Sequence, residues 1–158
     1  MAISPDNLIE DGFQIISNLI PDVHIEALKI LSQKFKNKPT EIRKNVFDKC
    51  DESYAIFKAI ESILNQQVLA CQMTSYCFFL EKTTDKNWPL LLHQDINLPQ
   101  YLNLSNDEVN YWLTHGFWVR VNLDANDKDT GAIKVIPQSH TKGKNSSFDK
   151  SEAVFFNC

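Results

Sequence analysis

Apolar residues in the first part of the chain recur at the three- and four-residue spacing of an amphipathic helix. One such segment opens at Pro21-Asp22 and closes around Lys36-Asn-Lys-Pro39, where polar residues and a proline interrupt the pattern. Its apolar positions are Val23, Ala27, Leu28, Ile30, Leu31 and Phe35. A second segment starts near Asp51-Glu52-Ser53, with apolar positions at Ala55, Ile56, Ala59, Ile60, Ile63 and Leu64. Both segments are predicted to be helices that pack as a scaffold.

The spacing changes to two residues in the second half of the chain, which indicates extended structure. Cys71–Leu80 is rich in aromatic residues and is predicted to form a strand. Further strands are expected at Phe117–Asp124, at Ala132–Ile136 and at Ala153–Phe156. In the first of these three, alternation places Val119, Val121 and Leu123 on one face and Trp118, Arg120 and Asn122 on the other.

Two shorter signals lie between the predicted strands. The polar run Ala125–Gly131 predicts a turn, because its Asn, Asp and Gly residues favour turn conformations. Asn103–Leu113 predicts a short helix that is capped by Ser105 or Asn106 and carries two acidic residues in its first turn. Together the signals alternate between turn, strand and helix without any internal repeat.

Helices followed by a run of antiparallel strands predict an α+β protein whose strands form a sandwich or barrel. The 158 residues are enough for one domain with a hydrophobic core. We expect a single domain, mainly helical over residues 1–70 and mainly β over residues 71–158. The 43% of hydrophobic and 23% of charged residues are typical of a globular protein.

The net charge of −4 argues against a nucleic-acid partner, since proteins of that class usually carry a basic face. No apolar run approaches the roughly 20 residues of a membrane helix. The first residues lack the basic and apolar regions of a secretory signal. No CxxC pair is present, which disfavours a zinc ribbon; the cysteines are Cys50, Cys71, Cys77 and Cys158. We therefore expect a cytoplasmic protein with reduced thiols and no membrane contact.

His93 and Asp95 are the residues best suited to carry chemistry. In an extended segment, residues two positions apart point the same way, so this imidazole and this carboxylate can converge on one metal ion. One His and one Asp supply two corners of the facial triad of non-haem Fe(II) oxygenases. An isolated pair of this kind arises by chance in many proteins, so its sequence context decides its meaning. Among the other histidines, His24 lies inside the first predicted helix and is expected at the surface.

The context consists of three stretches in a characteristic order. Glu81–Asp95 contains Asn-Trp followed by His-Gln-Asp, Val119–Asp124 is the alternating strand, and Asp129–Gly143 contains Pro137-Gln-Ser-His140. The opening Asp11–Ile16, which precedes the first helix, adds a less specific match. In order and spacing, these stretches resemble the phytanoyl-CoA dioxygenase family over nearly the whole chain.

The resemblance implies a double-stranded β-helix, or jelly-roll, flanked by helices. It implies Fe(II) and 2-oxoglutarate as cofactors, and hydroxylation of an unactivated C–H bond in a small-molecule or acyl substrate. It also implies that His93 and Asp95 bind the iron and that Lys82 matches the family's lysine before the Asn-Trp pair. Lys82 and Arg120 are then candidates for the carboxylate of 2-oxoglutarate. The alternatives are a solvated strand end for Lys82, and for Arg120 an ion pair with an acid such as Asp124.

A third iron ligand is harder to place. His140 matches the histidine of the family's Pro-Gly-Ser-His motif, which lies in a loop after a strand and is not the distal ligand. His115, in a predicted loop, is a weaker candidate. The distal histidine, and the arginine beyond it, are expected after the last strand and therefore beyond Cys158. Gln138 stands where the family has a glycine, whose backbone angles a glutamine disfavours, so this turn is expected to differ.

Three hypotheses about function remain open on these residues. The chain is a functional oxygenase with a third ligand from His140 or from another chain, a truncated and catalytically impaired family member, or a non-enzymatic cupin-like binding module. Missing closing strands would leave an exposed sheet edge, which favours a homodimer. The expected partner is otherwise a small-molecule substrate, whose identity the sequence does not select.

Overall fold

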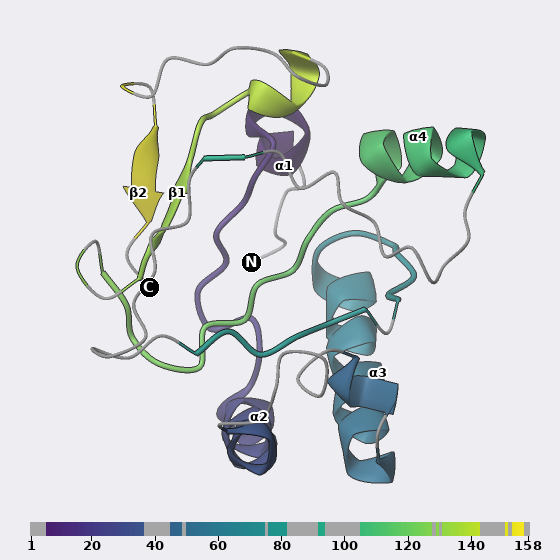
Figure 1. Ribbon diagram of the computed structural model, residues 1–158, viewed down its shortest axis with the longest axis vertical. Helices are drawn as coiled ribbons and strands as arrows, with labels where there is room; N and C mark the ends of the chain where they lie inside the picture. The colour runs from purple at the N-terminus through teal and green to yellow at the C-terminus, as the bar shows by residue number, and fades with distance from the viewer. Residues whose placement is uncertain are drawn as a thin grey trace.

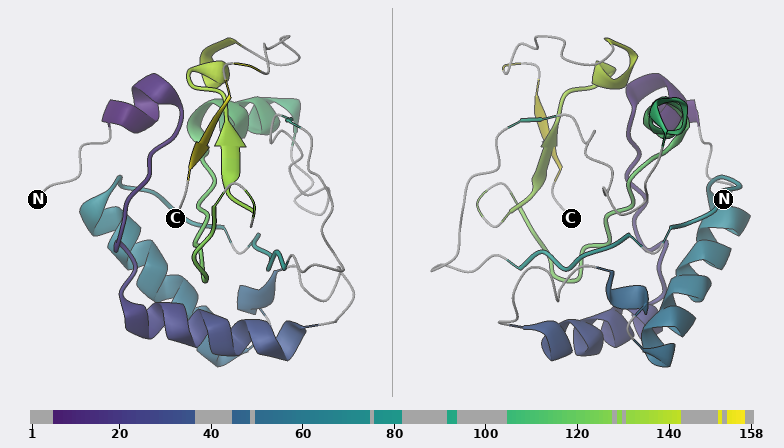
Figure 2. Two further views of the ribbon diagram at one scale, coloured as in Figure 1. Left: turned by 90° about the vertical axis from the view of Figure 1, so that its left-hand side faces the viewer. Right: turned by 45° about the vertical axis from the view of Figure 1, so that its right-hand side comes forward.

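The computed structural model describes residues 6–36, 45–48, 50–74, 76–81, 92–93, 105–127, 129, 131–142, 151 and 153–156. Its elements are α1 (Asp6–Asp11), α2 (Asp22–Phe35), η1 (Val46–Asp48), α3 (Asp51–Gln67), α4 (Asn106–His115), β1 (Ile133–Val135), η3 (Ser139–Lys142) and β2 (Val154–Phe156). Helices α2 and α3 lie together at one end of the molecule, whereas α1 and the β1–β2 pair lie at the other (Figure 1). Two further views show the same separation (Figure 2).

The core is formed between α2, η1 and α3, which pack against one another. The buried side chains follow the three- and four-residue spacing of a helix face. They are Leu28, Leu31, Phe35, Val46, Phe47, Phe57, Ile60 and Leu64. Each such side chain contributes roughly 1.5–3 kcal/mol when it leaves water. The two predicted helices are confirmed, because α2 and α3 begin at Asp22 and Asp51, where the sequence places their starts.

Two apolar positions of α2 do not join this core. Val23 is 69% exposed and Ile30 is 66% exposed. Both point away from Leu28, since a helix turns about 100° per residue. The apolar spacing therefore identified the helix correctly. However, the apolar positions counted in the sequence include residues outside the face that packs on the core.

Ser53 fixes the start of α3 from inside the core. Its side chain is fully buried, and its hydroxyl donates to the carbonyl of Cys50 at 2.7 Å. The same oxygen lies 3.4 Å from the carbonyl of Phe47 and 3.1 Å from the thiol of Cys50. A buried hydroxyl without partners would be costly, so these contacts explain how a polar residue sits among apolar ones. They also join η1 to the first turn of α3.

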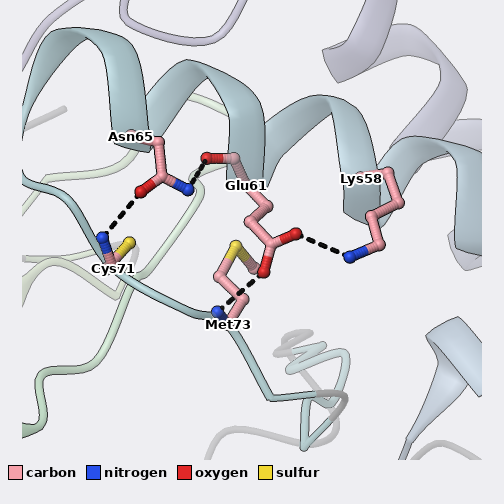
Figure 3. Close-up of polar contacts among 5 residues, drawn as sticks. All are labelled: Lys58, Glu61, Asn65, Cys71 and Met73. Carbon is pink, nitrogen blue, oxygen red and sulfur yellow. Dashed lines mark hydrogen bonds and ion pairs between the residues drawn. The ribbon is translucent and has the colours of Figure 1, made fainter.

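The predicted strand at Cys71–Leu80 is not formed as a strand ladder in its described residues, apart from an isolated bridge at Phe78. The backbone instead runs along α3, where side chains accept its amides (Figure 3). Asn65 Oδ1 accepts the amide of Cys71 at 2.7 Å, and Glu61 Oε1 accepts that of Met73 at 2.9 Å. Residues four apart on a helix are about 6 Å apart along its axis, close to the spacing of alternate residues in an extended chain. The two acceptors therefore take the place of a neighbouring strand.

The end of the same segment packs on α2. The ring of Phe79 stacks on that of Phe35 with centroids 6.2 Å apart. At the next residue after Phe35, Lys36 Nζ lies 3.7 Å from a carboxylate oxygen of Glu81. These contacts carry the chain from the helical core toward the residues that precede His93.

The described strands β1 and β2 pair antiparallel, with Ile133 opposite Phe156 and Val135 opposite Val154. Their positions confirm the two predicted strands at Ala132–Ile136 and Ala153–Phe156. The predicted strand at Phe117–Asp124 runs without ladder pairing, although Val121 and Leu123 pack on the core as its alternation indicates. One strand pair is compatible with many folds, so the jelly-roll stays a prediction.

The helix predicted at Asn103–Leu113 is formed as α4, but it extends to His115, which the sequence placed in a loop. The predicted cap and the polar turn are also found. Ser105 Oγ accepts the amide of Glu108 at 3.3 Å, while a Glu108 carboxylate oxygen accepts the amide of Ser105 at 2.9 Å. This reciprocal pair is a capping box. Hydrogen bonds from the Ser105 amide and then its hydroxyl hold the pKa of Glu108 below its ordinary value. In the turn, Asp127 accepts the amides of Gly131 and Ala132 through its carbonyl.

The described ranges contain neither a membrane-spanning helix nor a disulfide bond. None of their helices is both long and apolar enough to cross a lipid bilayer. No disulfide joins Cys50, Cys71 or Cys77, the cysteines within those ranges.

Candidate functional site

The pair that the sequence singles out is described only in part. His93 lies in a short described segment with Leu92, and its side chain is exposed to solvent. Asp95 and Lys82 lie outside the described residues, as does Trp88. The structure therefore places one of the two predicted iron ligands and one of the two predicted carboxylate-binding residues, Arg120.

Within the described part of the chain, no three His, Cys, Asp or Glu side chains form a group able to hold a metal ion. His24 lies in α2 and is half-buried. His115 ends α4, where its Nδ1 lies 3.0 Å from the carbonyl of Tyr111 and its ring stacks on the Tyr111 ring with centroids 4.3 Å apart. A carbonyl only accepts, so Nδ1 carries the proton in this arrangement. The His115 side chain is thus held by contacts within its own helix.

His140 is held against the first helix. Its Nε2 lies 3.0 Å from the carbonyl of Ile9, which requires that nitrogen to carry a proton and to donate. In this form Nε2 has no lone pair for a metal, whereas Nδ1 retains one. On the other side of the ring, a Cβ on Gly12 would overlap Nδ1 and would lie 2.8 Å from Cγ. The imidazole therefore occupies the space that a side chain at position 12 would need.

Arg120 is an exposed cation that the backbone and a neighbouring side chain orient. Its Nε donates to Asn122 Oδ1 at 2.9 Å, and one terminal nitrogen donates to the carbonyl of Gly131 at 3.1 Å. Both of these acceptors are uncharged. Two anchoring bonds fix the plane of the guanidinium, which preserves its forked geometry for a carboxylate.

Trp118, two residues before Arg120 in the sequence, belongs to a cluster of aromatic side chains. The Trp118 ring meets that of Tyr76 edge-on with centroids 5.6 Å apart, and Tyr76 in turn lies 6.2 Å from Phe78. Trp118 and Phe78 remain close to half exposed, so this cluster is not part of the core. The sequence analysis placed Trp118 on the predicted face of Arg120, but it did not single out Tyr76 and Phe78. Their two-residue spacing within Cys71–Leu80 was the signal available.

No protein-family model, no curated protein and no solved structure matches this chain. The family resemblance therefore depends on the motifs of the sequence itself. The described geometry adds an exposed His93, an Arg120 side chain oriented by two hydrogen bonds, and a His140 engaged in a backbone contact.

Proposed function

We propose that this chain is a domain of the Fe(II)- and 2-oxoglutarate-dependent dioxygenase type, with His93 and Asp95 as iron ligands. The observation that carries the proposal is the order and spacing of three motifs around His93-Gln-Asp95. An imidazole and a carboxylate are a donor set that Fe(II) accepts in such sites. The exposure of His93 supports the assignment, because a metal can reach its side chain. When bound, the iron and 2-oxoglutarate would supply the oxidising power to hydroxylate a C–H bond of a small-molecule or acyl substrate.

Arg120 is proposed to orient 2-oxoglutarate, with Lys82 as a second candidate. A carboxylate binds an arginine best when the guanidinium plane is already fixed, because less rotational freedom is lost on binding. The bonds to Asn122 and to the Gly131 carbonyl supply this fixation. Trp118, two residues before Arg120, and Tyr76, whose ring contacts that of Trp118, are proposed to shield the bound anion from water.

The fold that goes with this function is the jelly-roll, which we retain as part of the proposal. The antiparallel pairing of β1 with β2 is compatible with it. A homodimer through a sheet edge also remains part of the proposal, as does a cytoplasmic location. The absence of a disulfide among the described cysteines fits the reducing conditions of that compartment.

A second candidate function is binding of iron or 2-oxoglutarate without turnover. The specific observation in its favour is His140, the nearest downstream nominee for a third ligand, whose Nε2 donates to Ile9. With one histidine and one carboxylate, water would complete the coordination shell and the iron would bind weakly. The third possibility, a cupin-like module that binds no iron, is an outcome of the same experiment.

The test is an anaerobic titration of the whole chain with Fe(II) in the presence of 2-oxoglutarate, followed by calorimetry. His93→Ala and Asp95→Ala are expected to weaken Fe(II) binding by more than about tenfold, because each removes a direct ligand. His24→Gln, on α2, is the matched control and should leave the affinity unchanged. Unaltered Fe(II) affinity in His93→Ala would refute the ligand assignment.

Turnover separates the first candidate from the second. Addition of oxygen to the loaded protein should release succinate in proportion to the oxygen consumed if the chain is an oxygenase. Iron binding that depends on His93, without succinate release, would identify the binding function instead. Absence of iron binding in the unmodified chain would leave the cupin-like module.

A further inference from the structure

Two motifs that lie at opposite ends of the sequence meet in the structure. Asp11-Gly12 ends α1, and Pro137-Gln-Ser-His140 follows β1. The amide of Gln138 donates to the carbonyl of Asp11 at 2.8 Å, and His140 Nε2 donates to that of Ile9 at 3.0 Å. Figure 1 shows α1 directly beside the η3 turn that contains His140. Neither motif is used by the iron site proposed above.

The contacts satisfy the end of a helix. The last four carbonyls of a helix have no partner within it and must find one elsewhere. In α1 these belong to residues 8–11. The carbonyl of Leu8 accepts the amide of Gly12 at 3.1 Å, as in an ordinary helix end. Those of Ile9 and Asp11 are taken by His140 and Gln138, residues more than 120 positions away. The turn after β1 is thus the C-terminal cap of α1.

Backbone conformation on both sides is adapted to this fit. Gly12 has a φ of 81°, in the left-handed region that glycine favours, and its missing side chain leaves room for the His140 ring. Gln138 has a φ of 60°, the conformation for which a glycine was expected at this place in the motif. This conformation is unfavourable for a glutamine, and in it the Gln138 amide donates to the Asp11 carbonyl.

We infer that His140 is a positioning residue that caps α1 and does not coordinate iron. Together with Gln138 and Gly12 it forms a clasp, by which we mean the contact between the α1 C-terminus and the turn at residues 137–140. The clasp couples the order of the N-terminal helix to that of the β1–β2 pair. The inference rests on the proposed function only in excluding His140 from its iron site, and the geometry of the clasp requires no metal.

The test measures amide hydrogen exchange of Gly12 and Gln138 by NMR in the metal-free chain. His140→Ala should accelerate both amides roughly two- to tenfold, the range that loss of one exposed hydrogen bond allows. His140→Gln, whose side-chain amide can still donate to Ile9, should restore most of the protection. The amide of Leu64 in the helical core is the internal reference and should not change. Unchanged exchange at Gly12 and Gln138 in His140→Ala would overturn the inference.

A second variant keeps the test decisive if His140→Ala folds poorly. Gly12→Ala places a Cβ in the space of the ring, so it should displace His140 and accelerate the Gln138 amide as well. Because both changes then disrupt one contact, the double variant should exchange no faster than Gly12→Ala alone. Additive acceleration would show that the two residues act independently and would contradict the clasp.

Fe(II) titration of the same variants separates positioning from coordination. A positioning residue predicts an Fe(II) affinity that His140→Gln leaves within about twofold of the unmodified chain. Loss of Fe(II) binding in both His140→Ala and His140→Gln would make His140 a ligand and refute the inference. Failure of the unmodified chain to bind Fe(II) would refute the proposed function, while the exchange measurements would still decide the clasp.

Discussion

The α2–η1–α3 core and the region around α1 and β1 are stabilised in different ways. In the first, eight apolar side chains from three elements leave water together. In the second, Ile136 is the buried apolar residue recorded among the described ones, and the elements are joined by backbone hydrogen bonds and by His140. Apolar burial depends on area and tolerates small shifts, whereas hydrogen bonds depend on direction.

This difference bears on where function is located. The buried apolar side chains stabilise the helical core, but they offer a ligand no polar group to bind. The exposed His93, the oriented Arg120 and the half-exposed Trp118 all lie outside the helical core. We expect the second region to be the less stable one and to respond locally to substitutions that barely affect the first.

The largest expected effect comes from a single truncation in the core. Leu31→Ala should lower the free energy of unfolding by about 3 kcal/mol, because the removed atoms leave a cavity among packed neighbours. Ile30→Ala, one residue away on the exposed face of α2, should change it by less than about 0.5 kcal/mol. Urea denaturation followed by circular dichroism measures both. Equal losses in the two variants would contradict the assignment of the core face.

A smaller effect of opposite sign is expected in the turn after β1. Gln138→Gly removes the strain of a left-handed glutamine, partly offset by the greater freedom of glycine in the unfolded chain. The net result should be a stabilisation of about 0.5 kcal/mol. The same change on α2, Gln33→Gly, should destabilise by a similar amount, because glycine is unfavourable in a helix. If both variants lose stability in urea, Gln138 is not in the left-handed conformation.

The sequence predicted the helical region well because its determinants are local. Apolar spacing and acidic starts placed α2 and α3, and the Ser105-to-Glu108 spacing placed the cap of α4. The strand expected at Cys71–Leu80 failed for a tertiary reason, since Asn65 and Glu61 of α3 accept the amides that a strand neighbour would bind. No local pattern indicates such a partner.

The candidate site was predicted as residue types rather than as an arrangement. His93, Asp95, Lys82 and Arg120 follow from motif order, which carries no information on distance. His140 was excluded as an iron ligand because of its place in a motif. Its contact with Ile9 joins residues 131 positions apart in the sequence, so only the three-dimensional structure shows it. For Arg120 the sequence offered either the carboxylate of 2-oxoglutarate or an ion pair with an acid such as Asp124, and it indicated neither the Asn122 amide oxygen nor the Gly131 carbonyl that the side chain contacts.

The smallest expected effect lies at the border between the two regions, where Glu61 holds the segment that leaves the helical core. Hydrogen bonds from Lys58 and then from the Met73 amide hold the pKa of Glu61 below its ordinary value of 4.5. A carboxylate whose pKa is lowered by folding contributes stability above its unfolded pKa, and this contribution is lost as pH falls through the folded pKa. The protection of the Met73 amide against hydrogen exchange should therefore decrease below about pH 4.5.

The neighbouring residue supplies the control for this acid response. The amide of Cys71 is accepted by Asn65, which does not titrate, so its protection factor should remain constant over the same pH range. Glu61→Gln should abolish the pH dependence at Met73 while it retains a side-chain oxygen to accept the amide. If Cys71 and Met73 lose protection together, the segment is released as a whole by acid and the Glu61 carboxylate is not its specific anchor.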